Sequence, residues 1–185
     1  MIARRAGARV VTRWEAPEAE QLVDLFTGVS ALIADPDAAG GVDPARARLL
    51  PDGHRDDPGA AAGFRDMTEA GLIAAKRAAL AACVGELTGS GRTSPARGRA
   101  AAAGDSVEVR LDEPGLARWL RTLNDVRLAL GTRLESLGAD LAAGRPPDGL
   151  ARPDMAEAAR SMWLVYRWLT GVQDELVELA MSGAG

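Results

Sequence analysis

The chain has 185 residues, of which 47% are hydrophobic and 4% aromatic, and its formal net charge at pH 7 is −4. This length suits one domain with a core of Leu, Val and Ala, and because Ala and Leu favour helix we expect a mainly helical fold. The acidic net charge disfavours a nucleic-acid-binding domain, whose affinity comes mostly from phosphate contacts, although it is compatible with a local basic patch. No stretch approaches the ~20 apolar residues of a membrane span.

Cysteine content and the first residues indicate the compartment. Cys83 is the only cysteine, so an internal disulfide cannot form. The first residues lack the apolar core of a secretory signal. We therefore expect a cytoplasmic protein with no membrane contact.

The first third of the chain predicts one strand and one long helix. Arg9–Arg13 has the composition of a short strand. Residues 15–34 form a helix with Pro17 in its first turn, because apolar side chains recur at helical spacing. These are Ala19, Leu22, Phe26, Val29 and Ile33. A flexible loop is expected near residues 35–47, followed by a helical turn at 45–50.

The middle of the chain predicts two helices and a second strand. Asp57 and Pro58 begin a short helix over 58–65, and Thr68 caps a longer one that ends near Leu87. Residues 88–105 are rich in Gly and Ser and form a flexible loop. Residues 107–111 alternate as a strand does, and pairing with Val10–Thr12 would make a small two-stranded ribbon.

The best-specified element is a helix over residues 113–137. Its apolar line comprises Leu116, Trp119, Leu120, Leu123, Val126, Leu130, Leu134 and Leu137. Gly131 costs about 1 kcal/mol against Ala within a helix, so we expect it to permit close approach of another backbone. Asn124 and Arg127 lie at the edge of the stripe, and we expect this pair to order the bundle by hydrogen bonds, because a partly buried arginine needs partners.

After a flexible connection near 138–153, residues 154–181 predict a final helix. Trp163, Leu164 and Trp168 spread apolar surface around its middle turns. Such a helix is either central in its bundle or presents a face to a partner. The whole chain is expected to be a single domain, a compact bundle of about four main helices that docks the 113–137 helix inside it.

Few residues of the chain have side chains that could act in catalysis or bind a metal or phosphate. His54 lies among Asp52, Asp56 and Asp57, but the group lacks the spacing of known metal sites and is better explained as a capped turn. Cys83 lies on an apolar helix line, which indicates an inert buried thiol; a reactive thiol is the alternative. The loop containing Arg92, Arg97 and Arg99 has no phosphate-loop ending, so a solvated linker is favoured. We expect no cofactor, no metal and no catalytic residue.

Three segments together resemble one known family. They are Arg48–Pro58 with Phe64-Arg65 behind it, Trp119–Leu134, and Tyr166–Leu176. These resemble the actinobacterial AosR-like oxidative-stress transcriptional regulators, formerly classed as a domain of unknown function. The resemblance implies a role in the transcriptional response to oxidants, through a stress sigma factor and the control of cysteine-biosynthesis genes. With Cys83 alone, this chain departs from any member that senses oxidant by an internal disulfide.

The leading hypothesis is a non-enzymatic regulator that contacts a sigma factor or an RNA polymerase subunit, for which the acidic net charge suggests a basic partner. Two surfaces are expected to bind the partner: a charged one with Arg48, Arg55, Asp56 and Asp57, and an apolar one with Trp163 and Trp168. Trp119, Asn124, Arg127 and Gly131 are expected to be structural.

Three alternatives stay open. The first is a DNA-binding regulator that uses the N-terminal arginines and the Arg92–Arg99 loop. The second is a general protein-interaction module, with a homodimer also open, and the third is an enzyme that relies on His54.

Overall fold

The computed structural model describes residues 1–35, 43–51, 58–89, 106–147 and 153–182, with the backbone alone for 58–67 and 153–156. Within these ranges the fold is mainly helical, as predicted, with a small antiparallel sheet. Its elements in chain order are β1 (Ile2–Ala6), β2 (Arg9–Glu15), α1 (Ala16–Ala34), α2 (Pro44–Leu49), α3 (Pro58–Gly89), β3 (Ser106–Leu111), α4 (Glu113–Ser136) and α5 (Pro153–Met181). None of the described helices is long and apolar enough to cross a membrane.

The sheet has three strands in the order β1-β2-β3, so the predicted two-stranded ribbon was wrong by one strand. The β2–β3 pairing is confirmed, with Val10 opposite Leu111 and Trp14 opposite Val107. The missed strand, β1, consists of Ile, Ala and Arg and lacks an alternating apolar pattern. It reaches β2 through a tight turn in which Gly7 adopts a φ of +62°, a conformation that favours glycine.

One face of the sheet is apolar and packs on the helices. Val10, Thr12 and Trp14 from β2 point to this face, together with the three buried residues of β3. Trp14 stacks on Trp119 of α4 with ring centroids 5.6 Å apart. Phe26 of α1 meets the Trp119 ring edge-on at 5.9 Å, so the centre of the core is an aromatic cluster.

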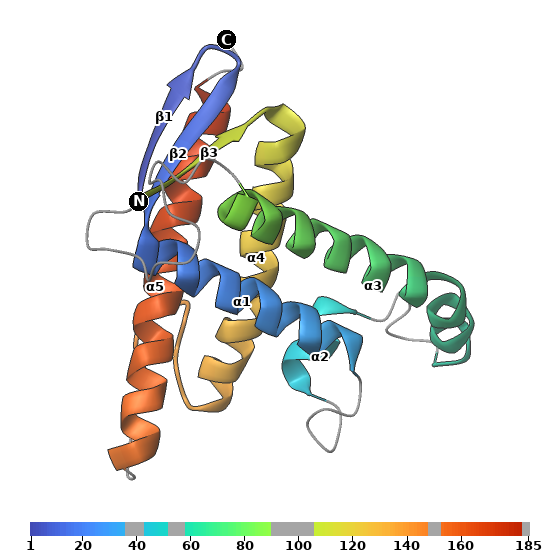
Figure 1. The fold of residues 1–185 in the computed structure, drawn as a ribbon. Coiled ribbons are helices and arrows are strands. Elements are labelled where there is room, and N and C mark those ends of the chain that lie inside the picture. Colours follow the sequence, from blue (N-terminus) through green and yellow to red (C-terminus); the bar gives the residue numbers. More distant parts are fainter. Residues whose placement is uncertain (36–42, 52–57, 90–105, 148–152, 183–185) are drawn as a thin grey trace.

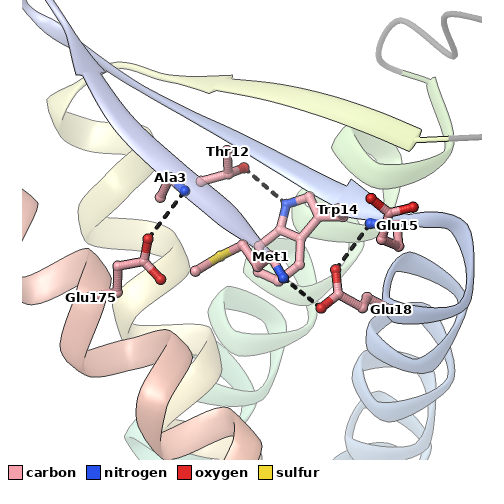
Figure 2. A network of polar contacts seen from close by, with 7 residues as sticks. All are labelled: Met1, Ala3, Thr12, Trp14, Glu15, Glu18 and Glu175. Carbon is pink, nitrogen blue, oxygen red and sulfur yellow. Dashed lines mark hydrogen bonds and ion pairs between the residues drawn. The ribbon is translucent and has the colours of Figure 1, made fainter.

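Polar contacts hold the ends of the sheet against α1 and α5 (Figure 2). The backbone amide of Ala3 donates to Glu175 Oε1 at 3.1 Å, which ties β1 to α5. The Met1 ammonium and the Glu15 amide donate to the two oxygens of Glu18 at 2.5 and 2.9 Å. The buried Trp14 indole donates to Thr12 Oγ1 at 2.8 Å, so its polar atom is satisfied inside the core.

The helices are arranged as two crossed pairs more than as one parallel bundle. α4 and α5 run side by side, and α1 and α3 pack on each other across α4 (Figure 1). The 113–137 helix is confirmed as α4, and most of its apolar line is buried, from Leu116 to Leu134. α1 likewise matches its prediction, and its five predicted core residues are all buried.

α3 is one continuous helix, whereas two helices were predicted over 58–65 and 68–87. Thr68 lies inside it and does not cap a second one. Threonine favours helix starts but also occurs within helices, and neither Gly nor Pro occupies residues 64–70. The helix continues to Gly89, two residues past the predicted end. Its outer half projects to the side, and no residue between Thr68 and Leu80 is buried (Figure 1).

Candidate partner-binding site

A small pocket of about 110 Å³ lies between α2, α4, α5 and the turn that follows α4. Its walls are Arg48, Asn124, Arg127, Leu128, Gly131, Thr132, Glu135, Leu141 and Tyr166. The three segments quoted for the family resemblance each contribute to these walls. Arg48 comes from the first segment, Asn124–Gly131 from the second and Tyr166 from the third. The fold therefore brings together residues that are far apart in the chain, and this is the candidate site.

Gly131 leaves room for side chains at the base of the pocket. A Cβ atom placed there would lie 3.0 Å from Leu141 Cδ1 and 3.5 Å from Tyr166 Cε2. The neighbours are thus two side chains, not the close backbone that the sequence led us to expect. A larger residue would have to displace Leu141 or fill the space beside Tyr166.

Arg127 forms the inner wall and joins α4 to α5. It donates from an Nη atom to Gln173 Oε1 at 2.9 Å, and its guanidinium lies 5.4 Å from the centre of the Tyr166 ring. Its Nε is buried without a hydrogen-bond partner. Arg127 therefore orders the helices by hydrogen bonding, as expected, but through Gln173 and not through Asn124, which is exposed on the pocket wall.

Arg127 differs from Arg46 and Arg118, two other partly buried arginines, in having no carboxylate partner within the described residues. Arg46 pairs with Glu69 at 3.0 Å, and Arg118 pairs with Glu86. Arg5 donates to the Leu179 carbonyl at the end of α5, at 2.6 Å. Within the described residues Arg127 has no carboxylate partner, and the same holds for the exposed Arg48. Within the described residues, the pocket thus presents two arginine side chains that have no ion pair, together with one carboxylate, Glu135.

The predicted tryptophan surface divides into two environments. Trp163 is half-buried and stacks on Tyr166 with centroids 6.1 Å apart, next to Leu164, whose exposed fraction is 62%. Trp163 is therefore in contact with one wall residue of the pocket, Tyr166. Trp168 lies against the core, edge-on to Trp14 at 6.5 Å, so it has a packing role whether or not a partner also touches it. Partner binding by both indoles stays a prediction.

Several predicted site residues lie outside the described residues. Arg55, Asp56 and Asp57 are among them, so Arg48 alone represents the predicted charged surface. His54 and the basic loop with Arg92, Arg97 and Arg99 also fall in undescribed ranges. Within the part of the chain that the structure describes, no group of three or more His, Cys, Asp or Glu residues could hold a metal ion.

The seam between α3 and α4 contains Cys83 in a closed polar network. The thiol is buried and lies 3.7 Å from Thr122 Oγ1, and burial raises the pKa of this thiol. One turn away, Glu86 accepts from Arg118 and from the Trp119 indole, the latter at 2.6 Å. Glu86 could not be identified from the sequence, because its partners lie on another helix and the local sequence does not indicate which residues of that helix it faces. Trp14 was also missed, although the alternation of Val10, Thr12 and Trp14 could have placed that side chain inward.

The outer face of the sheet is basic at one end. The pairing register places Arg4, Arg9, Arg13 and Arg110 on this face, and all four are exposed. Glu108 is the neighbour of two of them, pairing with Arg110 at 2.9 Å and with Arg13 at 3.5 Å. Hydrogen bonding from Arg110 is the main cause that lowers the pKa of Glu108. Glu15 lies on the same face at its far end.

Comparison with known proteins finds one family model and a group of named relatives. The model of a family described as a domain of unknown function, DUF2017, matches residues 1–180. Proteins named oxidative stress regulator AosR, from Mycobacterium bovis and two strains of Mycobacterium tuberculosis, are 32% identical over 153 residues. The matches cover 76% of this chain and 59% of each relative, so the chain spans about three fifths of their length. No solved structure matches the chain.

Proposed function

This chain belongs to the DUF2017 family, and from that premise we propose that it is a non-enzymatic, cytoplasmic regulator of the oxidative-stress response. It acts by contact with the transcription machinery, through a sigma factor or an RNA polymerase subunit. The observation that carries the proposal is the name of its relatives, oxidative stress regulator, at 32% identity over 76% of the chain.

The candidate pocket supports recognition of a protein more than of a small molecule. Its volume of about 110 Å³ is well below the roughly 300–1,000 Å³ of ligand and cofactor pockets. It equals the space of three or four water molecules at about 30 Å³ each. That space suits one inserted side chain, and Trp163, which stacks on the wall residue Tyr166, offers apolar surface of the kind that surrounds such anchors.

Affinity capture from cells tests the proposal. The tagged chain is expressed in a bacterium that itself contains a protein of this family, and the proteins captured with and without oxidant treatment are compared. We expect a sigma factor or a polymerase subunit to be enriched over a tag-only control. Recovery of neither, in any redox state, would contradict the proposed mode of action.

A second candidate function, direct contact with DNA, is favoured by one observation. The outer sheet face gathers four exposed arginines, Arg4, Arg9, Arg13 and Arg110, against Glu15 and Glu108. Arginines spread over a small sheet can neutralise successive phosphates, and each such contact adds about one to the salt slope of binding. A salt titration of binding to promoter DNA tests this function, with Arg4→Gln on the face and Arg77→Gln on α3 as the matched control. No complex at low salt would exclude it.

A further inference from the structure

We infer that the pocket between α2, α4 and α5 is an anchor site for a single carboxylate, the aspartate or glutamate side chain of a partner protein. This inference rests on the proposed function for the existence of a protein partner, and it adds the chemistry by which that partner is recognised. It also reverses the expectation from net charge. Although the whole chain is acidic, the point of contact is cationic and selects an acidic residue.

Within the described residues, Arg127 has no counter-ion. A half-buried charge is stable only when it is paired or well hydrogen-bonded. Arg127 has the neutral amide of Gln173 and the face of Tyr166, and its Nε is buried without a partner. Arg5, Arg46 and Arg118 also have an unpartnered Nε. Arg46 and Arg118 each pair with a carboxylate, and Arg5 donates to carbonyls at the C-terminal end of α5. Among these four arginines, Arg127 is the one that lines the pocket, with a neutral side-chain amide as its acceptor.

Other hydrogen-bond donors surround the same space. Arg48 and Asn124 line the pocket and are exposed, so their side-chain N–H groups are available. A carboxylate accepts several hydrogen bonds at once, and its bonds to guanidinium are stronger than bonds between neutral groups. An amide or hydroxyl from a partner could not neutralise two guanidinium groups. The donor set therefore favours a carboxylate.

The volume and the net charge of the pocket restrict the group that fits into it. A pocket of about 110 Å³ admits one side-chain end and no larger ligand. Glu135 also lines it, exposed and without an ion pair to either arginine in the described structure. Two arginines and one glutamate leave a net charge of about +1. That balance matches a carboxylate better than a phosphorylated side chain, which carries roughly −1.5 to −2.

Selection from a random peptide library tests the anchor without knowledge of the natural partner. The purified full chain is used as bait, and Arg48→Gln and Arg77→Gln are run in parallel. Both arginines are exposed and, within the described residues, unpaired, so both variants should fold; circular dichroism checks this. We expect the wild-type chain and Arg77→Gln to select peptides with an acidic residue at one fixed position. Arg48→Gln should lose that preference.

The selected peptide then gives a quantitative test. Replacing its anchor Glu by Gln should weaken binding to the wild-type chain by about tenfold or more. The same replacement should matter much less on Arg48→Gln. Peptides without an acidic anchor, no selection at all, or equal behaviour of the two variants would overturn the inference.

The two proposals can fail separately. Capture of a polymerase or sigma subunit equally well by the wild-type chain and by Arg48→Gln would reject the anchor and leave the regulatory role intact. Acidic-peptide binding at the pocket, without any transcription protein in the capture, would reject the proposed partner and leave the anchor intact.

Discussion

The two sides of α4 differ in how far their charged side chains are paired within the protein. Toward α3, Arg118 pairs with Glu86, and Asp125 accepts from Lys76 Nζ at 2.7 Å. Toward α2 and α5, Arg133 pairs with Asp43 at 3.2 Å, but within the described residues neither Arg127 nor Arg48, which both line the pocket, has a carboxylate partner. One helix thus has a closed side, where partners are internal, and an open side, where charge is left for another molecule.

This difference separates residues that hold the fold from residues that are free to serve recognition. Charges that are satisfied internally add stability or at least avoid a desolvation cost, and removing one partner exposes that cost. A cation left unpaired contributes little to stability, so its presence calls for another explanation. Substitutions on the closed side should therefore lower stability, and substitutions on the open side should lower binding.

The largest effect is expected at the aromatic centre of the closed side. Trp119 is fully buried between Trp14 and Phe26, and its indole donates to Glu86. Trp119→Ala should lower the free energy of unfolding by about 3–5 kcal/mol, measured by urea denaturation. Trp163→Ala on the open side should cost about 1 kcal/mol, the value of an aromatic pair. Similar losses at both positions would contradict the division.

Much of this closed side follows from sequence periodicity. The apolar lines of α1 and α4 were predicted almost residue for residue, because helical spacing is a strong signal when one face is fully buried. The β2–β3 pairing followed from two short alternating stretches. β1 could not be predicted, because Ala3 and Arg5 carry little apolar pattern and the strand is held by a hairpin turn and by Glu175.

The open side was predicted as separate residues and not as a site. Arg48, Asn124, Arg127 and Gly131 were each singled out, but no local pattern indicates that Arg48 faces Tyr166 across α4. Long-range contacts of single polar side chains depend on how helices cross, and periodicity within one helix does not encode that angle. The partner of Arg127 was missed for the same reason, since Gln173 is one polar residue among several on α5.

Removing Glu86 should be the next largest effect. Glu86→Ala leaves the Arg118 guanidinium and the Trp119 indole without their acceptor. We expect a loss of about 1–3 kcal/mol in the free energy of unfolding, the cost of stranding partly buried donors. The matched substitution on the open side, Glu135→Ala, should stay within about 0.5 kcal/mol. A Glu135 variant as unstable as the Glu86 variant would show that the pocket is also a closed network.

Two arginines of α4 give a sharper comparison. Arg127→Met keeps the approximate length of the side chain, loses the bond to Gln173 and removes a cation that has no counter-ion among the described residues. These changes oppose each other, so stability should change by no more than about 1 kcal/mol. Arg118→Met leaves Glu86 without its guanidinium partner, so it should lower stability by more than Arg127→Met does. Thermal unfolding of both variants measures the difference, and peptide binding should be lost only with Arg127→Met.

The smallest effect concerns Cys83, which belongs to the closed side and should behave as an inert thiol. Burial raises the pKa of this thiol above that of an unfolded cysteine, about 8.5. Below that pH both states keep the proton; above it the unfolded chain releases the proton first, so stability falls as pH rises. At pH 8.5 the loss is at most about 0.4 kcal/mol, which is RT ln 2 for a half-ionised unfolded thiol. Urea midpoints between pH 7 and 9.5 should therefore decline more steeply for the wild-type chain than for Cys83→Ala. If the urea midpoints of the two chains fell equally with pH, the thiol would ionise as readily in the folded as in the unfolded state. Cys83 would then be a candidate for reaction with oxidants.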